Sequence, residues 1–300
     1  MGLTRYEFEF LAWLEREGDG AYSMRTLSDT LKISASALYA AIQALEDRRC
    51  LRCEGQHFAL TEAGLAALEP YRVKRALILA AGFGSRMMPA TADRPKPLVT
   101  VNGVRILDTL LDALVAVGIT DITVVRGYKK ERFDELLEKY PFLTLVDNDE
   151  YDRTNNISSV MLALDKLGGY LCEADLYISN PRVITKYQYA SNILGSYSVE
   201  TDDWSFRMDA GGHIEQYQKG NTHCYNYYGI SYWTEEDGRR LKEDFQHTYE
   251  QPDGRDLFWE FIPLVLCRET YSVEVRPCEK SDIMEIDNYS ELQILDPSYE

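Results

Sequence analysis

The sequence has 300 residues, of which 45% are hydrophobic and 27% charged, which is the ordinary composition of a globular protein. Its length favours two domains over a single compact core. The formal net charge of −17 argues against general nucleic-acid binding, because phosphate backbones would be repelled. No apolar run approaches the roughly 20 residues that a membrane span needs, and no signal-peptide pattern is present, so we expect a cytoplasmic protein without a membrane partner.

Residues 1–72 are predicted to form a small helical domain with a hairpin. Apolar residues at three- and four-residue spacing indicate helices, and Ser23 and Ser34 are placed to cap the second and third of them. Two short strands are expected around residues 54–56, followed by a helix from about Thr61 to Leu68. This order of elements resembles a winged helix, whose usual function is to bind DNA.

The charge of this first domain favours an interaction or regulatory role instead. Residues 1–72 contain eight Lys and Arg against eleven Asp and Glu. The expected recognition helix, residues 34–47, has no basic residue, although phosphate contacts normally come from Lys and Arg. We therefore do not expect tight DNA binding.

Residues 73–300 are predicted to form a second domain in which strands alternate with helices. The apolar run at 74–81 ends in a glycine-rich turn, as expected for a buried parallel strand. A helix carrying Leu107, Leu111 and Leu114, a strand at 122–125, a helix around Phe133 and a strand at 143–146 follow. This alternation predicts an α/β fold with a mixed, mainly parallel sheet.

The most informative stretch is residues 79–98, with the sequence LAAGFGSRMMPATADRPKPL. Gly82 and Gly84 allow the backbone to approach a ligand closely, and the N–H groups of such a loop can bind phosphate oxygens. Arg86 and Lys96 add two positive charges. A dinucleotide-binding fingerprint is excluded because residue 87 is Met where a third glycine would stand.

The stretch resembles the signature of sugar-phosphate-type nucleotidyltransferases, in which L-A-A-G-x-G-x-R is followed by Pro and by Pro-Lys-Pro. Every one of these positions is matched. Within that group, residues 74–295 resemble the bacterial CTP:phosphocholine cytidylyltransferases. The matching segments include NDEYDRTNNISS (148–159), EADLYIS (173–179), DLFWE (256–260) and MEID (284–287). The resemblance implies a Rossmann-like nucleotidyltransferase domain behind a winged-helix domain.

The resemblance also implies roles for individual residues. Arg86 and Lys96 would be catalytic and hold the phosphates of CTP and the leaving pyrophosphate. Asp175 and Asp287 would bind Mg²⁺, the expected cofactor. The nucleotide would contact Leu79, Ala80, Ala81, Gly82, Gly84, Asn156 and Ser159. The chain departs from many relatives at Glu173, and a role for this residue is therefore not implied.

These assignments compete with structural interpretations of the same residues. Asn156 could be an ordinary turn residue, and most carboxylates are solvated surface charges. Asp175 and Asp287, however, each follow an apolar stretch. A carboxylate at the end of a strand is well placed to reach the mouth of an α/β site, which favours the metal role.

The acceptor site is expected to contain aromatic side chains beside carboxylates, because a trimethylammonium group is recognised by aromatic faces. Trp204 and Trp259 each lie next to acidic residues and are predicted to form its walls. Asp256 or Glu260 would balance the positive charge. Tyr232 and Trp233 lie in an apolar run and are better explained as core residues.

We thus expect a magnesium-dependent enzyme that makes CDP-choline and pyrophosphate from CTP and phosphocholine. Two alternatives remain open. One is a related nucleotidyltransferase for another acceptor, such as 2-aminoethylphosphonate, phosphoethanolamine or a sugar phosphate. The other is a transcription regulator that senses a metabolite. The presence of Arg86, Lys96, Asp175 and Asp287 together argues against a pure sensor, which has no need of metal-binding carboxylates.

Overall fold

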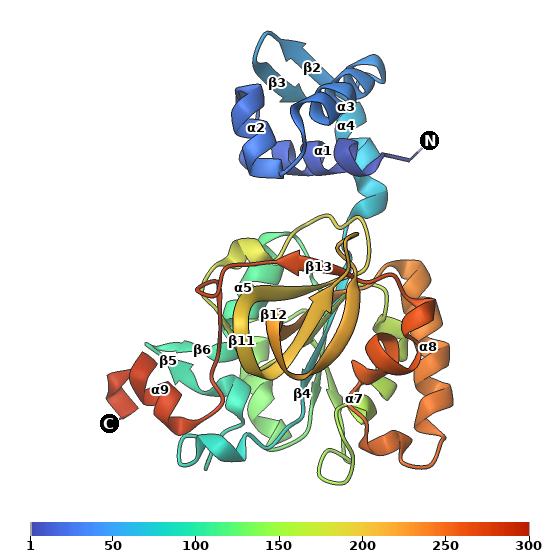
Figure 1. The fold of residues 1–300 in the computed structure, drawn as a ribbon. Coiled ribbons are helices and arrows are strands. Elements are labelled where there is room, and N and C mark those ends of the chain that lie inside the picture. Colours follow the sequence, from blue (N-terminus) through green and yellow to red (C-terminus); the bar gives the residue numbers. More distant parts are fainter. Residues whose placement is uncertain (1, 300) are drawn as a thin grey trace. The chain divides into compact units, whose positions relative to one another are not determined.

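The computed structural model describes residues 2–299, which divide into two compact units (Figure 1). The smaller unit runs to Arg72 and also contains Tyr187–Tyr189, whereas the larger holds Val73–Lys186 and the residues from Ala190 onward. Each unit has its own hydrophobic core. Across residues 2–299, no helix is both long enough and apolar enough to cross a membrane.

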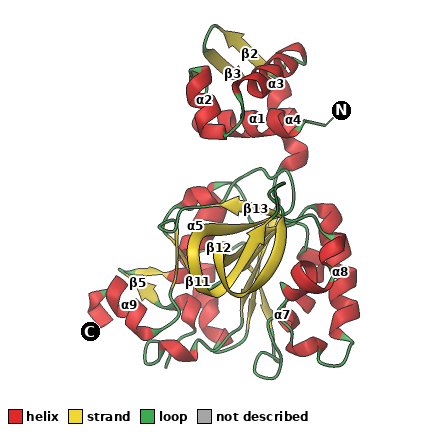
Figure 2. Cartoon of the chain, in the orientation of Figure 1, coloured by secondary structure: helices red, strands yellow, loops and turns green. Residues whose placement is uncertain are grey.

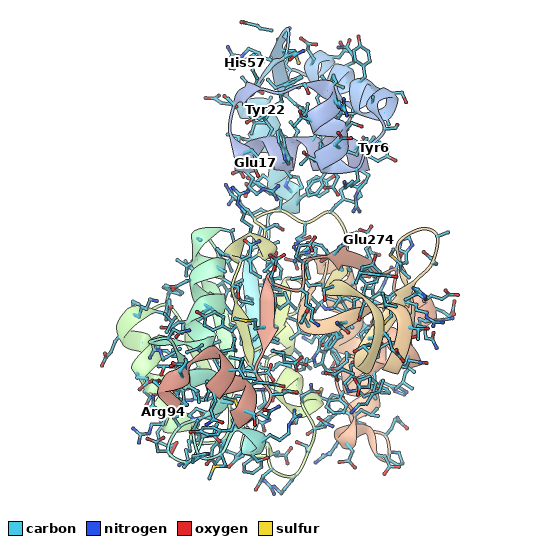
Figure 3. All side chains as sticks on the ribbon, turned by 60° about the vertical axis from the view of Figure 1, so that its left-hand side comes forward. Tyr6, Glu17, Tyr22, His57, Arg94 and Glu274 are labelled. Atoms are coloured by element: carbon cyan, nitrogen blue, oxygen red, sulfur yellow. The ribbon has the colours of Figure 1, made fainter. Side chains whose placement is uncertain are left out.

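The smaller unit packs helices against an antiparallel sheet with the strand order β1-β3-β2 (Figure 2). Its elements are α1 (Arg5–Glu17), β1 (Gly20–Ala21), α2 (Met24–Leu31), α3 (Ala35–Asp47), β2 (Leu51–Glu54), β3 (His57–Leu60) and α4 (Glu62–Leu68). Ser23 and Ser34 cap α2 and α3 as predicted, since their side chains accept hydrogen bonds from backbone N–H groups of the first turn. Tyr22, labelled in Figure 3, packs edge-on against Trp13. The winged-helix assignment remains a prediction.

Three residues from far along the chain complete the core of this unit. The rings of Tyr71 and Tyr189 stack with their centroids 5.5 Å apart, and Phe8 packs against both rings. The backbone N–H of Gln188 donates to the carbonyl oxygen of Tyr71 at 2.9 Å. The division expected at residue 72 did not include this segment, because a three-residue stretch between elements carries no local sign of where it packs.

The larger unit is built on a mixed sheet with the strand order β13-β11-β12-β9-β4-β7-β8. Its strands are β4 (Arg75–Ala80), β7 (Asp121–Arg126), β8 (Thr144–Asp147), β9 (Tyr170–Glu173), β11 (Asn192–Met208), β12 (Ile214–Tyr232) and β13 (Glu274–Pro277). Strands β9, β4, β7 and β8 are parallel to one another, while β12 runs antiparallel to both β9 and β11. The predicted mixed, mainly parallel α/β sheet is confirmed.

Helices cover both faces of this sheet, α5 on one side and α7 and α8 on the other (Figure 1). The helices of this unit are α5 (Ile106–Ala116), α6 (Leu136–Lys139), α7 (Ile157–Met161), α8 (Glu235–Tyr249) and α9 (Tyr289–Leu295). Because side chains alternate along a strand, Ile78 of β4 packs in the core on the α5 side and Leu77 in the core on the α8 side. This explains why residues 76–80 of β4 are all apolar.

Two short antiparallel ribbons complete the unit, β5 (Thr100–Val101) with β6 (Val104–Arg105), and β10 (Leu176–Ile178) with β14 (Ile283–Glu285). In the second ribbon, Leu176 lies opposite Glu285. This pairing returns the last part of the chain to the end of β9. It thereby brings Asp287 close to Asp175, although the two residues are more than a hundred positions apart.

Candidate active site

A cavity of about 780 Å³ opens where the parallel strands β4 and β9 end. Leu79 of β4 lies beside Glu173 of β9, so the loops that leave both strands meet at the same edge of the sheet. The cavity is lined by most of the residues singled out in the sequence, namely Leu79, Ala80, Ala81, Gly82, Gly84, Arg86, Lys96, Asn156, Ser159, Asp175, Trp204, Glu260 and Asp287.

The glycine-rich loop reaches its position because of two glycines with different functions. Gly84 has a φ of +60°, and a Cβ there would lie 2.6 Å from Cβ of Lys96, so only glycine lets the loop pack against this lysine. At Gly82, by contrast, a Cβ would meet no atom within 4 Å. The backbone at Gly82 therefore faces open space in the cavity, where a ligand can approach it. Arg94, labelled in Figure 3, follows in the same loop region.

Lys96 joins the two predicted metal ligands. Its Nζ donates to Oδ2 of Asp175 at 3.0 Å and to Oδ1 of Asp287 at 3.2 Å. Arg86 reaches the other oxygen of Asp287 at 3.1 Å, and its side chain is 70% exposed. Burial alone would lower the pKa of Lys96, but the two carboxylates outweigh it and raise the pKa, so the lysine stays charged.

A third carboxylate, which the sequence analysis missed, belongs to the same cluster. Carboxylate oxygens of Asp175, Glu285 and Asp287 lie within 4.8 Å of one another. Burial, followed by the charges of Asp175 and Asp287, raises the pKa of Glu285 to about 8. The signal was present in the sequence, because residues two apart on an extended segment point to the same side, as do Glu285 and Asp287 in MEID.

The opposite end of the cavity is aromatic. The rings of Trp204 and Tyr217 stack with centroids 5.1 Å apart and an interplanar angle of 17°. Phe258 packs edge-on against Trp204 at 6.2 Å. Trp204, Tyr227 and Phe258 line the cavity, and the role of Trp204 in binding an acceptor stays a prediction.

Two carboxylates, the buried Glu260 and the half-buried Glu173, line the cavity together with these aromatic residues. Glu260 is 4% exposed and accepts a hydrogen bond from Oη of Tyr217 at 3.2 Å, while its Oε2 has no hydrogen-bond partner among the described residues. Burial raises its pKa to about 7. Burial and then the charge of Glu260 raise the pKa of Glu173 well above its usual value. Glu173, whose role the resemblance left open, is thus part of the cavity.

Two predicted acceptor residues are wrong. Trp259 is wholly buried and packs edge-on against Trp233 with centroids 6.3 Å apart, so it belongs to the core and does not line the cavity. Phe258, its neighbour, occupies the wall instead. Asp256 is exposed and is absent from the cavity lining, because it lies in a turn at Gly254–Asp256 that precedes the wall. Glu260, the other carboxylate predicted for this role, does line the cavity.

Asn156 and Ser159 line the cavity, but their side chains also have protein partners. The Asn156 Oδ1 accepts a hydrogen bond from the backbone N–H of Trp259 at 2.8 Å. The Ser159 Oγ accepts one from Nδ2 of Asn148 at 3.0 Å. The structure therefore places both residues where they were expected while giving each of them a structural contact as well.

Comparison with known proteins agrees with this geometry. Residues 76–186 match the MobA-like NTP transferase domain. The chain is 38% identical over 228 residues to a 2-aminoethylphosphonate cytidylyltransferase from Lancefieldella rimae, covering 75% of this chain and 92% of that protein. It is 29% identical to the choline-phosphate cytidylyltransferase of Haemophilus influenzae, covering 75% and 99%.

The fold comparison leads to the same group. A solved structure of the CTP:phosphocholine cytidylyltransferase from Streptococcus pneumoniae superposes with a TM-score of 0.70 at 29% identity, covering 76% of this chain and all of that one. The residues that match the MobA-like NTP transferase domain, 76–186, contain the glycine-rich loop. The chain therefore belongs to the cytidylyltransferase family.

Proposed function

We propose that this cytidylyltransferase transfers the cytidylyl group of CTP to a small phosphonate or phosphate that carries a primary ammonium group. Its preferred acceptor in this proposal is 2-aminoethylphosphonate, and its cofactor is magnesium. The observation that carries the choice of acceptor is Glu260, a buried carboxylate at the cavity wall whose Oε2 lacks a donor among the described residues.

A buried, unpaired carboxylate is costly unless a ligand supplies both charge and hydrogen-bond donors. A primary ammonium offers three N–H donors and a positive charge, so it can satisfy Glu260 and Glu173 together. A trimethylammonium group has no N–H to donate. The relative at 38% identity is named for 2-aminoethylphosphonate, whereas the choline-phosphate enzymes are 29% identical, and this difference supports the same choice.

Phosphocholine, the acceptor expected first from the sequence, is the second candidate. The observation in its favour is the pair of aromatic side chains Trp204 and Tyr227, which line the cavity next to the carboxylates. Aromatic faces attract quaternary ammonium groups. They also pack well against the methylene groups of any aminoalkyl chain, and for this reason the aromatic wall does not separate the two acceptors.

The proposed reaction forms a bond between an acceptor phosphonate oxygen and the α-phosphorus of CTP, and the bond to the β-phosphate oxygen breaks, releasing pyrophosphate. A phosphonate or phosphate oxygen is already largely ionised near neutral pH, so no general base is required. In this proposal the backbone of residues 79–84 and Ser159 holds the nucleotide. Lys96 and Arg86 hold the negative oxygens of the phosphates, and Arg86 is exposed enough to follow the pyrophosphate as it leaves.

The residues present fit magnesium. Asp175, Glu285 and Asp287 offer three clustered carboxylates, the oxygen ligands that this ion prefers, and Oδ1 of Asp175 is buried without a hydrogen-bond partner among the described residues. When bound, magnesium would neutralise and align the negative oxygens of the two substrates. Lys96 keeps Asp175 and Asp287 together at the cavity wall.

A pyrophosphate-release assay tests the proposal. CTP, UTP, ATP and GTP would each be combined with 2-aminoethylphosphonate, phosphoethanolamine, phosphocholine and ethylphosphonate, which lacks the ammonium group. We expect activity with CTP and a kcat/KM for 2-aminoethylphosphonate at least about tenfold above those for phosphocholine and ethylphosphonate. A preference for phosphocholine would overturn the primary-ammonium proposal and leave the cytidylyltransferase family assignment standing.

A further inference from the structure

Asn156 is the residue directly before α7, at the N-cap position, yet its side chain does not cap that helix. Asparagine at this position normally accepts a hydrogen bond from an N–H of the first helical turn. The structure shows no such bond from the Asn156 side chain. Instead its Oδ1 accepts the backbone N–H of Trp259 at 2.8 Å, a residue 103 positions away in the sequence. The side chain is therefore used for a tertiary contact at the expense of the helix cap.

Asn155 binds the same distant segment. Its backbone N–H donates to the carbonyl oxygen of Arg255 at 2.9 Å, and its Nδ2 donates to that of Asp256 at 3.1 Å. Two consecutive asparagines thus make three hydrogen bonds to residues 255–259. We call this arrangement the asparagine clamp. It joins the loop before α7, which lines the cavity, to the segment that contributes Phe258 and Glu260 to the cavity lining.

The clamped segment alternates between core and cavity. The indole of Trp259 is buried against Trp233, whereas Phe258 and Glu260 on either side of it line the cavity. The segment contains no regular strand that would set these directions. Its orientation depends on two anchors at one residue: the indole of Trp259 in the core, and the backbone N–H of Trp259 on Asn156.

We propose that Asn156 is a positioning residue for the acceptor, holding residues 255–260 so that the carboxylate of Glu260 faces the cavity. Its function is therefore exerted through Glu260 and differs from the direct nucleotide contact expected from the sequence. A hydrogen bond from Tyr217 also favours the ionised form of Glu260 and lowers its pKa against the larger effect of burial. The inference rests on the proposed function for the identity of the acceptor.

The test uses substitutions that separate the two halves of the amide. Asn156→Ala removes the oxygen that accepts the Trp259 N–H without adding charge. Asn156→Asp is the matched control, since it keeps an oxygen at that position. Thermal melting of each variant verifies that the full chain is folded.

We expect Asn156→Ala, which removes the oxygen that accepts the Trp259 N–H, to raise the KM for the acceptor about tenfold or more while the KM for CTP stays within about twofold. Asn156→Asp, which keeps that oxygen, should change the acceptor KM by no more than about threefold. A larger effect of Asn156→Ala on the KM for CTP, or equal effects of Asn156→Asp and Asn156→Ala on the acceptor, would overturn the inference.

The design also distinguishes failure of this inference from failure of the proposed function. Each KM is measured with the acceptor that the wild-type enzyme uses best, whichever it is, so the result for Asn156 does not depend on the ammonium group. The ratio of activities with 2-aminoethylphosphonate and ethylphosphonate is measured only in the wild-type enzyme. It reports how much the ammonium group contributes to activity, which the proposal attributes to Glu260. A ratio near one would refute the proposed acceptor, while the KM results would still decide the role of Asn156.

Discussion

The two ends of the active-site cavity balance their charges differently. At the phosphate end, Lys96 lies between Asp175 and Asp287, with hydrogen bonds of 3.0 and 3.2 Å, so the fold supplies its own counter-charge. At the acceptor end, neither Glu173 nor Glu260 forms an ion pair with a described Lys or Arg, and burial raises the pKa of both. This contrast is the basis of the proposal that the acceptor carries a positive charge.

The largest expected effect comes from substitutions at the phosphate end of the cavity. Asp175→Asn or Asp287→Asn removes one of the clustered carboxylates, and we expect turnover to fall a hundredfold or more, on the order of 3 kcal/mol of transition-state stabilisation. Turnover at saturating magnesium and calorimetric magnesium affinity in the presence of CTP measure the loss. Glu285→Gln should weaken magnesium binding in the same direction. Wild-type turnover and magnesium affinity in the Asp175 variant would remove the metal assignment.

A smaller effect is expected at the acceptor end. Glu260→Gln keeps the size of the side chain but removes its charge, and should raise the KM for 2-aminoethylphosphonate about 10- to 100-fold, or about 1.5–3 kcal/mol for a charge-assisted hydrogen bond. Steady-state kinetics with each substrate varied in turn provide the measurement. Asp256→Asn, at an exposed residue outside the cavity, is the control and should leave both KM values unchanged. An unchanged acceptor KM in Glu260→Gln would refute the charge comparison.

The smallest expected effect is a pH dependence at the acceptor end. The pKa of Glu260 is raised to about 7, so this carboxylate is neutral at lower pH and charged at higher pH. The kcat/KM for an ammonium acceptor should therefore rise as the pH increases through about 7, by up to about tenfold per unit on the acidic side. Tyr217, Tyr227 and Glu173 also face this group and shape its titration.

The control for this pH profile is Glu260→Gln, because a phosphorylated acceptor itself loses a proton near pH 6. Pyrophosphate release between pH 5.5 and 8.5 in the wild type and the variant separates the two titrations. The inflection that disappears in the variant belongs to Glu260. Identical profiles would remove Glu260 as a source of the pH dependence.

Sequence alone was sufficient for features that are encoded locally. Gly82, Gly84, Arg86 and Lys96 lie within 15 consecutive residues, and their backbone and charge requirements can be read from residue type and spacing. Apolar periodicity likewise predicted β4 and α5, and Ser23 and Ser34 predicted helix starts. These signals depend on neighbours a few residues away, so they survive without knowledge of the fold.

The tertiary structure alone decided which side chains of the acceptor end face the cavity. In the irregular segment 255–260 no period of two or 3.6 applies, so the sequence analysis placed Trp259 in the wall and missed Phe258. Glu173 and Glu260 come together from positions 87 apart, and their raised pKa values arise from burial by several elements at once. Burial and long-range charge are properties of the packed chain, and for that reason neither was visible in any single stretch of sequence.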